Sequence, residues 1–198
     1  MTGEKILNYK IENFTDENRL FRSFLATHTY FSKKVIVKTL KPLDNFQQKA
    51  EFIDEIQRLS HIQHPNVVTL YDHLETANEF YLIFEHVEGR SLADYIQNTS
   101  GPIPEEKTQL LLEKILDAFA LAHQNGIMNG VVSASNIIIT PDENVKVLDL
   151  ALSKFYRQIA LSYEDREALS FASPEQIEGR RGDPRSDVYA LGCSCFRC

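Results

Sequence analysis

The chain has 198 residues and a formal net charge of −7, with 43% hydrophobic and 25% charged residues. These values are typical of a globular protein of one domain or two small lobes and exclude a disordered chain. The acidic balance and the lack of a Lys/Arg-rich run argue against nucleic acid as a partner. No apolar stretch approaches the roughly 20 residues of a membrane span, and the start lacks a signal peptide's apolar segment. We therefore expect a cytoplasmic protein with no membrane partner.

The first part of the chain is rich in predicted strands. Alternating and β-branched segments predict strands at 9–14, 20–28, 34–40, 67–73 and 79–86. Between the third and fourth of these, Phe52, Ile56 and Leu59 recur at helical spacing and predict a helix over 45–61. The His64-Pro65 step that follows is a helix stop.

Helices dominate after the turn signal at Gly89. Apolar periodicity predicts helices at 91–97 and 104–124, a strand pair at 137–140 and 145–148, a short helix after Ser173, and a last helix from about Ser186. A strand-rich part followed by a helical part predicts an α+β fold of two lobes around a cleft. We place the division between residues 1–88 and residues 89–198.

All three cysteines fall within the last six residues, at Cys193, Cys195 and Cys198. A metal site needs three or four converging ligands, so three reduced thiols on one terminal helix are the favoured interpretation. That pattern suits a reducing compartment. The role of the three thiols stays open.

The order of elements and motifs resembles the protein kinase family, especially the bacterial eukaryotic-like Ser/Thr kinases. The segment VIVK at 35–38 stands where the family has V-A-I-K. Further matches follow in family order: the glutamate of a helix followed by HPNVV, the hinge-like run FYLIFEHVEGR, the segment SNIII, the triplet Asp-Leu-Ala, and the segments SPE and DVYALG. The resemblance implies a bilobal kinase fold whose C-terminal lobe is incomplete.

The resemblance also implies a set of binding residues. It assigns nucleotide contacts to Lys38, Glu55, Glu85 and Val87, and Mg²⁺ coordination to Asn136 and Asp149. In the family the lysine holds ATP phosphates and is itself held by the helix glutamate. Here Lys38 and Glu55 fit equally well as a structural ion pair that joins the sheet to the helix.

The catalytic stretch departs from the family pattern. The family's H-R-D-x-K-P-x-N reads NGVVSASN here, so Val131 replaces the catalytic base and Ser133 replaces the lysine that neutralises phosphate charge. Ala168 stands where many Ser/Thr kinases carry a threonine that contacts both groups. A valine accepts no proton, so we expect no catalytic residue at these positions.

The nucleotide-binding part departs as well. No glycine occurs between Gly3 and Gly89, so the stretch 15–24 lacks the glycines that let backbone amides approach phosphates. Ile36 replaces the small alanine that faces adenine, and Ala151 stands where glycine usually ends the Asp149 triplet. Ile36 should crowd the base, which favours weak or absent ATP binding, and Ala151 should restrict rearrangement of the triplet.

These features predict a catalytically impaired pseudokinase that acts as a regulator or scaffold through a protein partner. The alternative is a divergent active Ser/Thr protein kinase or another ATP-dependent transferase on the kinase fold, so its status as an enzyme stays uncertain. The chain ends within the helix that contains Asp187, which suggests either a fragment or a lobe completed by a partner. In the family, the residue matching Glu175 pairs with an arginine from a later helix, so we expect that carboxylate to lack its usual partner and the incomplete lobe to favour self-association.

Overall fold

The computed structural model describes residues 5–18, 20–41, 46–76, 79–99, 103–128, 132–152, 155, 172–180 and 182–195. The chain forms two compact units, and each is described by itself. Unit 1 comprises residues 1–54 and 69–86, and unit 2 comprises residues 55–68 and 87–198. The predicted lobe division at residue 88 stays a prediction.

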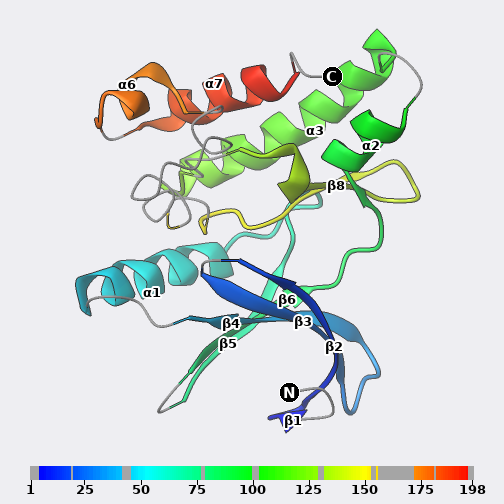
Figure 1. The fold of residues 1–198 in the computed structure, drawn as a ribbon, viewed down its shortest axis with the longest axis vertical. Coiled ribbons are helices and arrows are strands. Elements are labelled where there is room, and N and C mark those ends of the chain that lie inside the picture. The colour runs from blue at the N-terminus through cyan, green and yellow to red at the C-terminus, as the bar shows by residue number, and fades with distance from the viewer. Residues whose placement is uncertain are drawn as a thin grey trace. The chain divides into compact units, whose positions relative to one another are not determined.

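Unit 1 is built on a six-stranded antiparallel sheet with the strand order β1-β2-β3-β4-β6-β5 (Figure 1). The strands are β1 (Lys5–Ile6), β2 (Tyr9–Glu17), β3 (Phe21–His28), β4 (Lys34–Leu40), β5 (Leu70–Glu75) and β6 (Phe80–Glu85). Sequence neighbours pair through short turns, and only β4 and β6 pair across an intervening helix and strand. The predicted strands are confirmed, and β1 is an addition.

The two faces of this sheet pack differently because side chains alternate along each strand. On one face, buried aliphatic and aromatic side chains form a hydrophobic cluster: Ile11, Phe24, Ala26, Val35, Val37, Tyr81 and Ile83. On the other face the Phe52 ring of helix α1 (Phe46–Ser60) lies 6.0 Å from the ring of Phe21 and 5.6 Å from that of Phe80. The helical spacing that predicted α1 therefore also marks the residue that covers this face.

Unit 2 contains the helices α2 (Leu92–Asn98), α3 (Glu105–Gln124), α6 (Pro174–Ile177) and α7 (Pro184–Cys195), with the 3₁₀ turn η1 (Ala134–Asn136). Ser91 is the N-cap of helix α2, because its side chain accepts the backbone N–H of Asp94. A three-stranded sheet of β7 (Arg90–Ser91), β8 (Ile137–Ile139) and β9 (Val145–Val147) completes the unit. The predicted helices and the β8–β9 pair are confirmed within two or three residues at their ends.

The segment after α1 is joined to β9. Val67 forms a parallel bridge with Val147, and the Asn66 side chain donates to the carbonyl of Val145 (2.9 Å) and to Oδ1 of Asn144 (3.0 Å). Because Asn66 is buried, these bonds satisfy an amide that would otherwise be costly to bury. The His-Pro-Asn step thus stops α1 and anchors the β8–β9 hairpin. Among the described residues, no helix is both long and apolar enough to cross a bilayer.

Candidate functional site

Lys38 lies in the middle of the unit 1 sheet. It is paired with Ser23 of β3 and Leu82 of β6, on the face that also packs against α1. Its Nζ lies 5.8 Å from the ring centres of both Phe21 and Phe84, at the outer limit of cation–π attraction. The ammonium group is therefore held over an aromatic surface.

Ile36 shares that face with Lys38. Its register partners are Leu25 and Phe84, and it is half-buried. Isoleucine has three more carbons than the family's alanine. These carbons lie two positions from Lys38 and would reduce the space for an adenine ring on this face of the sheet.

Glu85 ends β6 opposite Val35, which places its side chain on the other face of the sheet from Lys38. Its Oε2 accepts the N–H of Thr69 at 3.2 Å, and its own N–H donates to the Thr69 carbonyl at 2.9 Å. The carboxylate thus holds the start of β5, and a nucleotide role for Glu85 stays a prediction. Val87 is half-buried just after the strand, and its role also stays a prediction.

The turn between β2 and β3 occupies the place of the family's glycine-rich loop. The Asn18 N–H donates to the Phe21 carbonyl (3.0 Å), and Asn18 Oδ1 accepts the N–H groups of Leu20 and Phe21 at 2.9 Å each. Two backbone amides at this tip are therefore already bound by a side chain. A phosphate group would have to displace Asn18 to reach them. Sequence reasoning missed this residue, although asparagine at the start of a tight turn is a known signal.

Glu55 of α1 is only 1% exposed. Its Oε2 accepts a hydrogen bond from Nη1 of Arg58, one helical turn along, at 3.2 Å. A buried carboxylate without a cation would be strongly unfavourable, so Arg58 contributes to its stability. The i, i+3 spacing was visible in the sequence, but Arg58 was not predicted as part of the site.

Asn136 ends η1 directly before β8, and Asp149 comes two residues after β9. The N–H of Leu148, the residue before Asp149, donates to the Asn136 carbonyl at 2.7 Å. This bond continues the β8–β9 ladder and keeps the two segments together, as the resemblance implied. Both residues offer the oxygen ligands that Mg²⁺ prefers.

Metal coordination at this place rests on these two residues. Within the described ranges, no group of three or more His, Cys, Asp or Glu side chains could hold a metal ion. The donor types at Asn136 and Asp149 fit Mg²⁺. Mg²⁺ binding stays a prediction.

The backbone of the Asp149 segment is strained. Asp149 has φ +53° and Ala151 has φ +70°, and Ala151 is fully buried. Glycine adopts this left-handed region without penalty, whereas a residue with a Cβ pays roughly 1–2 kcal/mol. The alanine that replaces the family's glycine thus occupies a glycine-type conformation.

Ser133 takes the place of the family's phosphate-neutralising lysine. Its Oγ accepts the N–H of Ser135 at 3.2 Å, and its carbonyl accepts the N–H of Asn136 at 2.9 Å. The residue therefore starts η1 and provides no positive charge. The predictions for Val131 and Ala168 fall outside the described residues.

The segment around Glu175 lines a cavity of about 460 Å³. Glu175 Oε1 accepts the hydroxyl of Ser173 at 2.6 Å and a short hydrogen bond from the hydroxyl of Ser186. These two bonds lower the pKa of Glu175 below its usual value. Glu175 therefore has two local hydroxyl partners, and the family's arginine contact stays an expectation from the resemblance.

The C-terminal end of α3 and the N-terminal end of α7 meet at a polar pair. His123 Nε2 lies 2.8 Å from Oδ2 of Asp187, which is 2% exposed. Sequence reasoning did not predict this pair because its members are 64 residues apart. Cys193 on α7 is a free, half-buried thiol, while Cys198 and the side chain of Cys195 lie outside the described part.

Comparisons with known proteins agree on one family. The protein kinase domain family matches residues 22–198. The chain is 31% identical to the serine/threonine-protein kinase PrkC of Bacillus subtilis over 99% of its own length, and 32% identical to the serine/threonine-protein kinase PknB of Mycobacterium leprae over 73%. It covers 31% and 24% of those two proteins. The fold matches the PknI kinase domain of Mycobacterium tuberculosis with a TM-score of 0.80 at 18% identity, over 99% of this chain and 75% of that one.

Proposed function

Because the chain belongs to the protein kinase family, we propose that it is a pseudokinase, a kinase domain with impaired phosphotransfer that acts through a protein partner. The observation that carries the proposal is Val131 at the position of the catalytic base. A general base contributes about 10²–10⁴-fold to rate, so its loss alone would leave a slow kinase.

Two structural features support a larger loss of phosphotransfer activity than the missing base alone would cause. Ser133 caps η1 and supplies no charge to a transferred phosphoryl group. At the β2–β3 turn, Asn18 engages two amides of the kind that would otherwise bind phosphate. Positioning and charge neutralisation usually contribute more than the base, so these features also favour weak or absent ATP binding.

The first prediction concerns binding and turnover of the 198-residue chain. We expect calorimetry with ATP, with and without Mg²⁺, to detect weak binding or none, and radiolabelled ATP to yield no phosphoprotein above the background of Asp149→Ala. We expect the double substitution Val131→Asp, Ser133→Lys to leave the rate at that background, because the β2–β3 turn is unchanged. Turnover by the unmodified chain that Asp149→Ala abolishes would overturn the proposal.

A divergent active kinase or other ATP-dependent transferase is the second candidate. It is favoured by the bond between Leu148 and Asn136, which keeps both predicted Mg²⁺ ligands on adjacent segments. This candidate requires ATP binding that depends on Mg²⁺ and is lost in both Asn136→Ala and Asp149→Ala. Saturating ATP with neither heat of binding nor labelled product excludes it.

A further inference from the structure

Two turns meet at one end of the unit 1 sheet. The turn between β1 and β2 contains Leu7 and Asn8, and the turn between β3 and β4 spans residues 29–33. The N–H of Thr29 donates to the Asn8 carbonyl at 2.8 Å, and the N–H of His28 donates to the Lys33 carbonyl at 2.8 Å. Residues 5–10 and 28–34 therefore form one connected surface, called here the paired-turn end.

The paired-turn end exposes large apolar side chains. Phe31 is 79% exposed, Tyr30 is 75% exposed and Leu7 is 64% exposed. The rings are held in place, because His28 lies 4.7 Å from Phe31 and contacts Tyr9 edge-on at 5.1 Å. Removing exposed apolar side chains from water lowers the free energy, so a surface that covers these rings would be stabilised by the contact.

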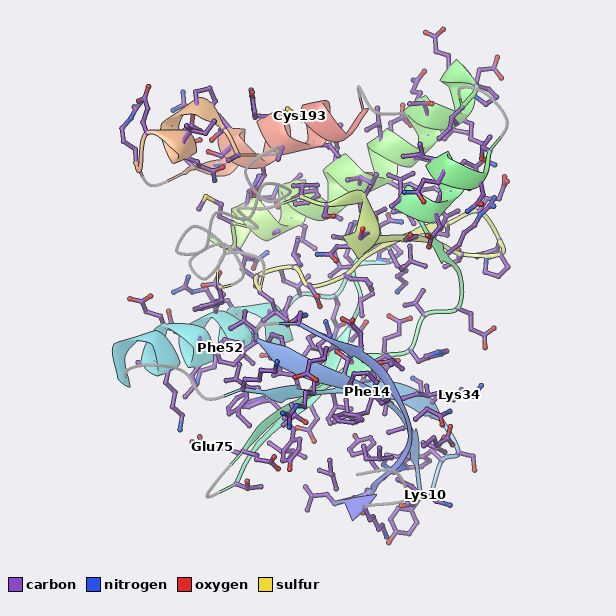
Figure 2. All side chains as sticks on the ribbon, viewed as in Figure 1. Lys10, Phe14, Lys34, Phe52, Glu75 and Cys193 are labelled. Atoms are coloured by element: carbon purple, nitrogen blue, oxygen red, sulfur yellow. The ribbon has the colours of Figure 1, made fainter. Side chains whose placement is uncertain are left out.

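Four lysines belong to the same strands and turns as these apolar side chains. Lys5 and Lys10 are direct register partners on β1 and β2, and Lys33 and Lys34 lead into β4. In Figure 2, Lys10 and Lys34 lie on the side of the sheet away from Glu75. Like charges directly opposite each other on paired strands are unfavourable unless an anion offsets them.

Lys33 remains charged at neutral pH. Its Nζ lies 4.2 Å from the centre of the Tyr71 ring, and the hydrogen bond to Tyr71 raises the pKa of Lys33. The negative charge of Glu85 also raises the pKa of Lys33. Asp72 is a second acidic side chain near this end, where its charge affects Tyr9. Four lysines on this end contrast with the net charge of −7 of the whole chain.

We propose that the paired-turn end docks onto an anionic lipid surface. Apolar side chains at turns with lysines beside them match a bilayer interface, where rings enter the headgroup region and ammonium groups meet lipid phosphates. An acidic peptide is the other source of negative charge, but the apolar groups here stand out from turns instead of lining a groove. The inference departs from the expectation of no membrane partner and is independent of catalysis.

The second prediction tests this surface with the full chain and vesicles. Co-sedimentation should show binding to phosphatidylcholine vesicles that contain 30% phosphatidylserine, and little to phosphatidylcholine alone. Each lysine near an anionic surface contributes about fivefold in affinity, so Lys10→Gln with Lys34→Gln should weaken binding by roughly 10–30-fold. Phe31→Ser should weaken it by about tenfold. Salt at 0.5 M should reduce binding by the unmodified chain.

Matched substitutions outside the paired-turn end provide the controls. Ile177→Ser removes an apolar side chain that is 64% exposed in unit 2, and Lys49→Gln with Lys114→Gln removes the same charge as the lysine pair above. Both should bind vesicles like the unmodified chain, and thermal melts should show that all variants fold. Three results would refute the proposal: no preference for anionic vesicles, equal losses in controls and paired-turn variants, or binding to poly-glutamate without binding to vesicles.

Discussion

At the scale of single residues, the carboxylate of Glu175 is held by two hydroxyl groups of its own unit. The hydroxyls of Ser173 and Ser186 donate to one of its oxygens, and these bonds lower its pKa. A lowered pKa in the folded state means that the charged form stabilises the fold above the unfolded pKa of about 4.3. That contribution is lost as the pH falls through the folded pKa.

The third prediction follows from that pKa. Between pH 7 and pH 3, the melting temperature of the unmodified chain should fall more steeply below about pH 4.5 than that of Glu175→Gln, because glutamine has no proton to take up. Ser186→Ala removes one donor and should show an intermediate slope. Parallel curves for the unmodified chain and Glu175→Gln would contradict this reading.

Residues 131–136 and 149–151 decide the chemistry open to the chain. Val131 and Ser133 were readable from motif spacing alone, because a valine or serine cannot perform the family's proton or charge role wherever it points. The Lys38–Glu55 pair that the resemblance implied stays a prediction, whereas Arg58 was not readable as a partner of Glu55, because a buried glutamate accepts from whichever cation the fold brings near. The structure shows Arg58 as one such partner.

At the level of elements, the β2–β3 turn differs from the family's glycine-rich turn in what its backbone amides bind. A glycine-rich turn leaves its amides open, whereas this turn closes on the Asn18 side chain. The turn is tight because only residues 18–20 separate β2 from β3, and Glu17 is already paired with Arg22. The hydrogen bonds of Asn18 stabilise the turn and occupy the two amides.

The fourth prediction tests Asn18 as the residue that holds the turn. Asn18→Ala leaves the amides of Leu20 and Phe21 without their acceptor and should lower the free energy of unfolding by about 1 kcal/mol, measured by urea denaturation. Asn18→Asp keeps the acceptor and should retain most of that stability. Equal stability for the alanine variant and the unmodified chain would show that water replaces the side chain at no cost.

At the scale of the whole molecule, apolar side chains of unit 2 remain exposed. Leu110 and Leu116 on α3 are 59% and 43% exposed, and Val188 and Tyr189 on α7 are 56% and 45% exposed. The predicted self-association of the chain stays a proposal, and these side chains are its physical basis. They lie in a different unit from the paired-turn end, so the two surfaces are separable by mutation.

The fifth prediction concerns the association state of the 198-residue chain. Analytical ultracentrifugation should show association that rises with concentration, and Leu116→Ser with Val188→Ser should shift the chain toward monomer. Phe31→Ser should leave association unchanged while it weakens vesicle binding. A chain that is monomeric at all concentrations would refute self-association, and association that only Phe31→Ser removes would assign the contact to the paired-turn end.

The amino-acid sequence by itself determined the family, the order of the main elements and the valine at the position of the family's catalytic base. Those features depend on local periodicity and on motif spacing, both of which are written along the chain. Only the tertiary structure decided that Asn18 closes the β2–β3 turn, that Asp149 and Ala151 adopt left-handed backbone, and that Thr29 joins two turns into one lysine-rich end. These outcomes depend on strand register and on partners that no local pattern specifies, since each residue type is compatible with many neighbours.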